Sequence, residues 1–265
     1  MKKVAFILSL GLAFAFSCNT VPVTGRKQLS LVSNSEIFPM SFQSYKSVLD
    51  SSKISKDKNQ VEMVRSVGVK VQKAVEQYMA DKGLSSQLNG YQWEFNVIDE
   101  NIVNAWCMPG GKVVFYTGIL PICKDEKGIA VVMGHEVAHA IANHGGERMS
   151  QGMVQQLGFS ALSVAISEKP AETQQLYSTA YGVASNVGGM LPFSRLQESE
   201  ADKMGLVFMA MAGYDPHEAP KFWERMTQGS SGGAPPEFLS THPSHSTRIQ
   251  QLNEAIPEAM KYYKP

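Results

Sequence analysis

Apolar residues along most of the chain recur at helical spacing. Between residues 64 and 78 the apolar positions lie three or four residues apart, which predicts an amphipathic helix that ends near Gly83. The same spacing predicts helices at residues 33–49, 125–143, 147–167, 172–188 and 197–211, a short helix that starts at 215–216, and a last helix from about residue 244. Ser33 and Glu36 have the spacing of a capping box at the first of these helices.

The alternation of apolar and polar residues that indicates a half-buried strand is short and local. Trp93, Phe95 and Val97 alternate with polar residues, and a second extended segment at 113–117 follows a Gly110-Gly111 turn. Glycine, serine and proline dominate residues 229–236, which predicts a mobile loop. The fold class is therefore predicted to be mainly α with a small β-sheet (α+β), in one domain at residues 33–265.

The first residues have the pattern of a processing signal. Lys2 and Lys3 precede an apolar run at 4–16, which is shorter than the about 20 residues of a membrane-spanning helix. This pattern predicts a signal peptide at residues 1–17. Ser17-Cys18 then resembles the end of a bacterial lipoprotein signal, in which the cysteine is lipidated, although Ala15 and Phe16 depart from that pattern. The alternative is ordinary signal cleavage with a free cysteine.

Lipidation of Cys18 would make residues 18–32 an extended tether to a membrane, and would place the protein at the periplasmic face of the bacterial cell envelope as an outer-membrane lipoprotein. The formal net charge of the 265 residues is zero, which does not favour a nucleic-acid partner. Cys107 and Cys123 remain; export permits a disulfide between them, but two buried thiols are the favoured interpretation. Neither has a metal-ligand spacing.

One motif carries metal chemistry. His135-Glu136-Val137-Ala138-His139 is an H-E-x-x-H pattern, in which two histidines four residues apart share one face of a helix. Both imidazoles can therefore reach one zinc ion, and Glu136 can act as a general base beside it. The motif lies within an apolar run, where a glutamate and two histidines are costly to bury without a partner.

A catalytic zinc site needs a third protein ligand and an open fourth position. Glu198 and Asp202 lie four residues apart on a predicted helix, so Glu198 can ligate zinc while Asp202 orients a ligand histidine through its other ring nitrogen. Glu200 is expected to point elsewhere. A solvated acidic helix start is the alternative, but the H-E-x-x-H motif favours the ligand. His144, His217 and His245 are expected at the surface or at helix caps.

These motifs resemble the gluzincin metallopeptidases of the CAAX prenyl protease and the Oma-type quality-control proteases. The resemblance begins with H-E-x-x-H at 135–139 and E-x-x-A-D at 198–202. It extends to N-A-x-x-x-P-G-G at 104–111, the stretch at 142–151, and Thr241-His242-Pro243 with Arg248. P-V-T-G-R at 22–26 is similar to the start of the short bacterial lipoprotein members. The resemblance implies a zincin-type domain with H-E-x-x-H on a central helix.

The resemblance also implies roles for individual residues. His242, assisted by Arg248, is expected to stabilise the oxyanion, and His242 is alternatively expected to bind zinc when its loop closes. Without these roles, His242 would be an ordinary loop residue and Arg248 would form an ion pair on a helix surface. A strand edge is expected to bind extended peptide through the segment that contains Asn104, Ala105, Pro109, Gly110 and Gly111; a plain hairpin is the alternative.

The expected activity is zinc-dependent hydrolysis of peptide bonds in unfolded or misassembled envelope proteins, in contact with envelope protein partners. The alternative from another class is a non-catalytic, zinc-containing periplasmic chaperone or assembly partner, against which the intact Glu136 argues, because a structural site needs no base. A third interpretation is a zinc hydrolase of small amides or of the cell wall, which only the resemblance separates from a protease. Prenylated substrates are not implied, because the multi-span helices of the prenyl protease are absent.

Overall fold

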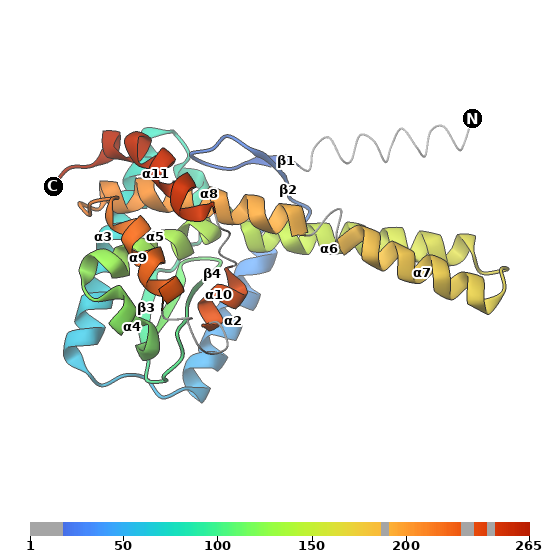
Figure 1. Ribbon diagram of the computed structural model, residues 1–265, viewed down its shortest axis with the longest axis horizontal. Coiled ribbons are helices and arrows are strands. Elements are labelled where there is room, and N and C mark those ends of the chain that lie inside the picture. The colour runs from blue at the N-terminus through green and yellow to red at the C-terminus, as the bar shows by residue number, and fades with distance from the viewer. Residues whose placement is uncertain (1–17, 187–190, 229–235, 243–246) are drawn as a thin grey trace.

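Helices form most of the protein, and a small sheet lies within the helical body (Figure 1). The computed structural model describes residues 18–186, 191–228, 236–242 and 247–265. The fold class predicted from the sequence, mainly α with a small sheet, is confirmed. The elements are β1 (Cys18–Thr20), β2 (Lys27–Leu29), α2 (Asn34–Ser51), α3 (Lys58–Asp81), η1 (Ser85–Leu88), β3 (Glu94–Ile98), β4 (Ala105–Met108), β5 (Lys112–Tyr116), η2 (Thr117–Ile119), α4 (Leu120–Cys123), α5 (Glu126–Ile141), α6 (His144–Ala165), α7 (Ala171–Ser185), α8 (Leu191–Met211), α9 (Glu218–Gln228), α10 (Glu237–Thr241), α11 (Arg248–Ala259) and η4 (Met260–Tyr262).

The larger sheet has three strands in the order β3-β5-β4. Strand β3 is parallel to β5, whereas β4 is antiparallel to it, with Ala105 opposite Phe115. The turn between β4 and β5 uses Gly110 and Gly111, whose φ angles of 87° and 86° lie in the region that favours glycine. The turn predicted at these glycines between two extended segments is therefore present, and β4 is an edge strand of this sheet.

Helix α5 carries the H-E-x-x-H motif through the centre of the body. Every residue from Gly128 to Ile141 is buried, so the helix is apolar on all sides apart from the motif itself. Asp125 begins it by accepting hydrogen bonds from the backbone N–H groups of Lys127 (2.8 Å) and Gly128 (3.2 Å). Burial on all sides explains why the predicted helix at 125–143 is confirmed nearly residue for residue.

Helices α5 and α8 cross at two glycines. A Cβ atom on Gly134 would lie 2.7 Å from the carbonyl oxygen of Gly205, and one on Gly205 would lie 2.9 Å from the backbone nitrogen of His135. The two backbones can approach this closely only because neither residue has a side chain. The crossing places the middle of α8, with Glu198 and Asp202, directly against the motif on α5.

The segment 18–32 differs from the extended tether expected from the sequence. Strands β1 and β2 pair antiparallel, with Cys18 opposite Leu29, and form a hairpin. Its turn is closed by a hydrogen bond from the N–H of Val21 to the carbonyl of Arg26 (2.8 Å), and Val21 is only 1% exposed. Burial of this side chain in the core, together with the turn, folds the segment onto the domain.

Other boundaries differ from the predictions in smaller ways. Helix α8 begins at Leu191, six residues before the predicted start, and the short helix α10 was not predicted. Helices α6 and α7 form a hairpin that extends to one side of the body (Figure 1).

Cys107 and Cys123 are free thiols. The predicted signal peptide at 1–17 and most of the predicted loop at 229–236 lie outside the described residues. Among the described helices, none is long and apolar enough to cross a bilayer.

Candidate active site

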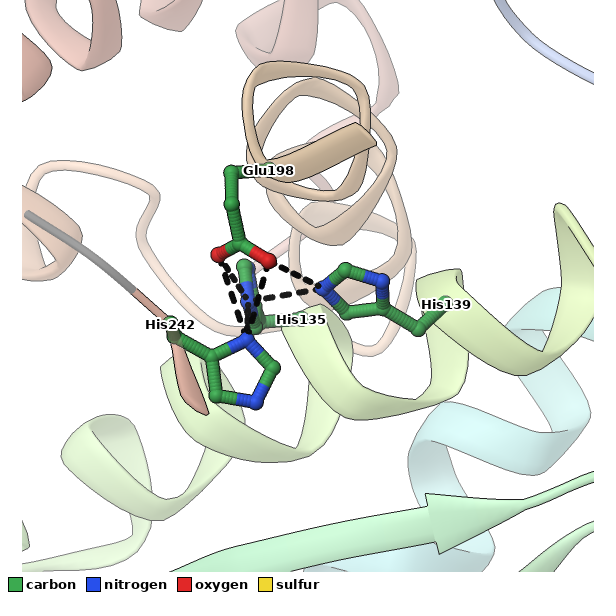
Figure 2. A group of neighbouring side chains, drawn as sticks. All are labelled: His135, His139, Glu198 and His242. Atoms are coloured by element: carbon green, nitrogen blue, oxygen red, sulfur yellow. Dashed lines mark hydrogen bonds and ion pairs between the residues drawn. The ribbon is translucent and has the colours of Figure 1, made fainter. Parts of the chain in front are cut away.

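Four side chains from three parts of the chain converge on one point (Figure 2). His135 and His139 come from α5, Glu198 from α8, and His242 directly follows α10. One ligand atom from each lies within 4.8 Å of the others. The structure therefore brings together the three predicted metal ligands and places His242 beside them.

The distances within the cluster fit one tetrahedral zinc ion. Nε2 of His135 lies 3.1 Å from Nε2 of His139 and 3.2 Å from Nδ1 of His242. The carboxylate oxygens of Glu198 lie 3.3 Å from His139 Nε2 and 3.1 Å from His242 Nδ1. Ligands about 2.0–2.1 Å from zinc in a tetrahedron are separated by about 3.3–3.4 Å. Imidazole nitrogens and a carboxylate are also the donors that zinc prefers, so these residues fit the ion.

His135 is held from behind by a carboxylate. Its Nδ1 lies 3.0 Å from Oδ1 of Asp202, and the same oxygen accepts a 2.7 Å hydrogen bond from Nη2 of Arg248. Arg248 is 1% exposed, and its guanidinium lies 3.4 Å from the centre of the Trp223 ring, which is a cation–π contact. Arg248 thus does not form the helix-surface ion pair that the sequence left open; its contacts orient the groups that support the ligands.

His139 is held by a residue that the sequence analysis assigned to the surface. His144 is 0% exposed, and its Nδ1 lies 2.8 Å from Nδ1 of His139. Its Nε2 lies 3.0 Å from a carboxylate oxygen of Glu200, which is also buried. The expectation of a surface or capping role for His144 was wrong. Helical spacing gives no signal for it, because α5 ends at Ile141 and a new helix begins at His144.

Glu136 is placed to act as a base. Its side chain is buried beside the cluster, and Oε1, which has no hydrogen-bond partner among the described residues, lies 3.3 Å from Nε2 of His242. Burial raises the pKa of the Glu136 carboxyl. A raised pKa suits a carboxylate that must accept a proton near neutral pH.

The charge of Glu198 is balanced by the histidines around it. Burial alone would raise the pKa of Glu198, but His135, His139 and His242 hold it well below the ordinary range, so the carboxylate is ionised. Burial lowers the pKa of His139 well below its usual value, whereas, against the lowering effect of burial, Asp202 and Glu198 raise the pKa of His135 to about 9. A neutral imidazole and an ionised carboxylate are the forms that bind zinc.

The predicted peptide-binding strand lies beside this cluster. Strand β4 packs against α5, the helix that carries Glu136. Burial and, to a smaller extent, the charge of Glu136 raise the pKa of the Cys107 thiol on β4 well above its usual value. Asn104 is buried, and its Nδ2 donates to Glu237 of α10 (3.0 Å), while the N–H of Phe238 donates to the carbonyl of Val103 (3.0 Å). Helix α10, which precedes His242, is thus fastened to the start of the edge strand.

The buried helix with H-E-x-x-H, the glutamate from a second helix and the adjacent edge strand define a metallopeptidase site. Comparison with known proteins agrees: residues 68–256 match the model of peptidase family M48. The chain therefore belongs to peptidase family M48 and is a zinc metalloendopeptidase.

Relatives of the chain occur in mitochondria and in bacteria. The chain is 33% identical to the mitochondrial metalloendopeptidase OMA1 of Schizosaccharomyces pombe over 257 residues, which are 96% of this chain and 71% of that protein. It is 36% identical over 185 residues to the human mitochondrial metalloendopeptidase OMA1, covering 66% of this chain and 34% of that protein. It is 26% identical over 245 residues to the β-barrel assembly-enhancing protease of Escherichia coli, covering 89% of this chain and 47% of that protein. The chain thus spans less than half of the length of the human and the Escherichia coli proteins.

Proposed function

We propose that the chain is a zinc-dependent endopeptidase of the bacterial cell envelope that hydrolyses unfolded or misassembled proteins. The observation that carries this proposal is the convergence of His135, His139 and Glu198 on one point, with the Glu136 carboxylate directly beside them. A purely structural zinc site would need no base. The position of Glu136 therefore favours catalysis over the alternative, a non-catalytic zinc-containing chaperone or assembly partner.

The residues of the site divide the work of peptide hydrolysis. His135, His139 and Glu198 would hold one zinc ion, which when bound supplies a Lewis acid for the scissile carbonyl and lowers the pKa of water. Glu136 takes a proton from the attacking water and returns it to the leaving amine. Asp202 and Arg248 keep the His135 ring oriented from behind.

The edge strand supplies the binding surface for substrate. An edge strand offers unpaired backbone groups to which an extended peptide can add as a further strand. Main-chain hydrogen bonds depend little on the side chains of the peptide, so the substrates would be extended or unfolded segments of many proteins. The segment that contains Asn104, Ala105, Pro109, Gly110 and Gly111 includes β4 and its turn, and its position at the edge of the sheet supports this role.

The position of His242 supports a resting state in which the enzyme is restrained. Its Nδ1 lies 3.1 Å from both carboxylate oxygens of Glu198, in the position of a fourth metal ligand, and its Nε2 faces Glu136 at 3.3 Å. The ring thus stands between the ligand cluster and the base, where the attacking water must be. In this arrangement His242 restrains the enzyme, and it can serve as the oxyanion donor only after it leaves the cluster.

The proposed location rests on the sequence of the N-terminus and on one relative. Lys2, Lys3, the apolar run at 4–16 and Cys18 support a signal peptide at 1–17 and a lipid anchor on an outer-membrane lipoprotein. The Escherichia coli relative is named for enhancing β-barrel assembly, which supports envelope proteins as partners and substrates. The mitochondrial relatives are also metalloendopeptidases, so they support the proposed activity but not the proposed location.

Two variants of the purified protein test the activity. Glu136→Gln keeps the shape of the side chain but cannot act as a base, so it should retain zinc and lose casein digestion. Glu198→Ala removes a ligand and should lose both zinc and activity. Zinc would be measured by elemental analysis and proteolysis with unfolded casein, with and without a chelator. Digestion by Glu136→Gln at more than a few per cent of the wild-type rate would remove Glu136 from the mechanism.

A further inference from the structure

An arginine of the N-terminal hairpin (residues 18–29) reaches into the support of the metal site. Nε of Arg26 donates to Oε2 of Glu200 (2.8 Å), and the Thr24 hydroxyl donates to the other oxygen of that carboxylate. The Nη1 and Nη2 atoms of Arg26 donate to the two oxygens of Glu147 (2.7 and 2.8 Å). Glu147 and Glu200 are 2% and 4% exposed, so the two carboxylates are shielded from water, whereas the Arg26 side chain is 17% exposed.

The other side of Glu200 leads to a metal ligand. Its Oε2 lies 3.0 Å from Nε2 of His144, whose Nδ1 lies 2.8 Å from Nδ1 of His139. His139 turns Nε2 toward the cluster, so its proton must be on Nδ1 when it ligates. The partners then assign every proton: His139 Nδ1–H donates to His144 Nδ1, and His144 Nε2–H donates to Glu200. With both rings neutral and Nε2 of His139 on the metal, this is the one set of tautomers that satisfies every contact.

The two histidines of the motif are thus supported in parallel ways. Behind His135, a buried aspartate holds the ring and Arg248 holds the aspartate. Behind His139, His144 and the buried Glu200 hold the ring and Arg26 holds the glutamate. The second support differs in that its arginine lies 174 residues from Glu200 in the sequence and belongs to the hairpin at the N-terminus.

We propose that Arg26 is a positioning residue of the metal site. Through Glu200 and His144 it holds the His139 ring in the ligating orientation, so the N-terminal hairpin is needed to retain the metal. The proposal rests on the proposed zinc ligands, but it does not depend on the substrate. Changes to groups that orient metal ligands typically lower metal affinity by about 10–100-fold, which sets the size of the expected effect.

Loss of zinc from the full-length purified protein to a chromogenic chelator measures this role without any proteolysis. Arg26→Ala should release zinc about 10–100-fold faster than wild type. Arg26→Lys keeps the charge but loses the planar guanidinium, so its rate of zinc release should lie between those of wild type and Arg26→Ala. Arg65→Ala, which changes an exposed arginine of α3, is the matched control and should behave as wild type.

A second pair of variants separates orientation of the ligand from general docking of the hairpin. Glu147 and Glu200 both bind Arg26, but only Glu200 contacts His144. Glu200→Gln should therefore release zinc nearly as fast as Arg26→Ala, whereas Glu147→Gln should stay within about threefold of wild type, because it leaves the chain to His139 intact. Thermal unfolding of the metal-free proteins would report the contribution of each carboxylate to the fold alone.

Two outcomes would overturn the proposal. One is wild-type zinc release from Arg26→Ala and Glu200→Gln; the other is equal acceleration by Glu147→Gln and Glu200→Gln, which would reduce the hairpin to general structural support. Should Arg26→Ala fail to fold, Arg26→Lys and Glu200→Gln carry the same comparison. A wild-type protein that holds zinc without digesting casein would contradict the proposed function but not this inference.

Discussion

Each histidine of the cluster uses both of its ring nitrogens, but not in the same way. His135 and His139 direct Nε2 to the cluster and Nδ1 to a buried support, Asp202 for one and His144 for the other. His242 directs Nδ1 to the cluster, and its Nε2 faces Glu136, the base itself. The two motif histidines are therefore anchored in the helical scaffold, whereas His242 can leave the cluster without breaking either support.

The close approach of the α5 and α8 backbones can be tested by adding one methyl group. In Gly205→Ala the new Cβ would lie 2.9 Å from the backbone nitrogen of His135, so the helices must separate. This should cost about 1–3 kcal/mol of unfolding free energy and draw Glu198 away from His135, which weakens zinc binding. Urea unfolding of the metal-free protein and zinc analysis of the loaded protein would measure both effects.

Gly152 of α6 provides the matched control, because a Cβ there meets no atom within 4 Å. Gly152→Ala should be neutral or more stable by up to about 1 kcal/mol, since alanine favours the helix. Equal stability of the two variants would show that the crossing tolerates a wider spacing than the structure has.

The site residues that could be predicted from the sequence are those whose spacing within one helix indicates a shared face. His135 and His139 share a helix face because they are four residues apart, and the same spacing joins Glu198 to Asp202. His144 was missed because its second partner, Glu200, lies 56 residues away, and nothing in the local pattern brings the two together. A buried histidine looks like a surface one until the tertiary fold supplies the group that satisfies it.

At the scale of elements, helix α10 and strand β4 are joined by hydrogen bonds. Helix α10 is bound to the start of β4 through Asn104 and Glu237 and through the backbone of Val103 and Phe238. His242 follows this helix directly, and its N–H donates to the carbonyl of Phe238 (2.8 Å). In the proposed mode of substrate binding, a peptide added to the edge of β4 would lie close to the segment that carries His242 and could displace it.

Removal of the His242 ring should distinguish restraint from assistance. If His242 mainly restrains the resting enzyme, His242→Ala should digest unfolded casein faster than wild type, and this is the expected result from its place in the cluster. It should keep zinc, because His135, His139 and Glu198 remain. If its main role is to stabilise the oxyanion, turnover should fall about 100-fold or more. His217→Ala, at an exposed histidine paired with Asp215, is the control.

Element prediction succeeded where one periodic signal dominated. Helix α5 was located nearly completely because apolar residues surround its motif on every face and Asp125 caps its start. The hairpin β1–β2 was taken for an extended tether, because its strands have three residues each and it is stabilised by Arg26 and Val21 contacts with distant parts of the chain. Short strands carry too few residues for alternation to be recognised.

For the whole molecule, the N-terminal hairpin carries both the expected lipid site and part of the support of the metal site. Cys18 begins β1, and Arg26 in the same hairpin binds Glu147 of α6 and Glu200 of α8. The N–H of Leu31 also donates to Oγ of Ser150 (2.9 Å), so the segment is fastened to α6 beyond the strands. A protein anchored at Cys18 would thus be held at the membrane through a folded element and not through a free tether.

Substitution of the expected lipid site should separate anchoring from metal binding. Several acyl chains hold a protein stably on a membrane, whereas one holds it only marginally, so a protein with unmodified residue 18 should leave the membrane fraction. Cys18→Ser is therefore expected to move to the soluble fraction, or to accumulate unprocessed, and to lose labelling by a fatty-acid analogue. Its zinc content should stay at the wild-type level once it is folded, because Glu147 and Glu200 hold Arg26 in place. Cys107→Ser is the matched control and should keep both the label and the membrane association. Unchanged fractionation of Cys18→Ser, with no lipid on Cys18 of the wild type, would leave simple secretion as the better interpretation of residues 1–18.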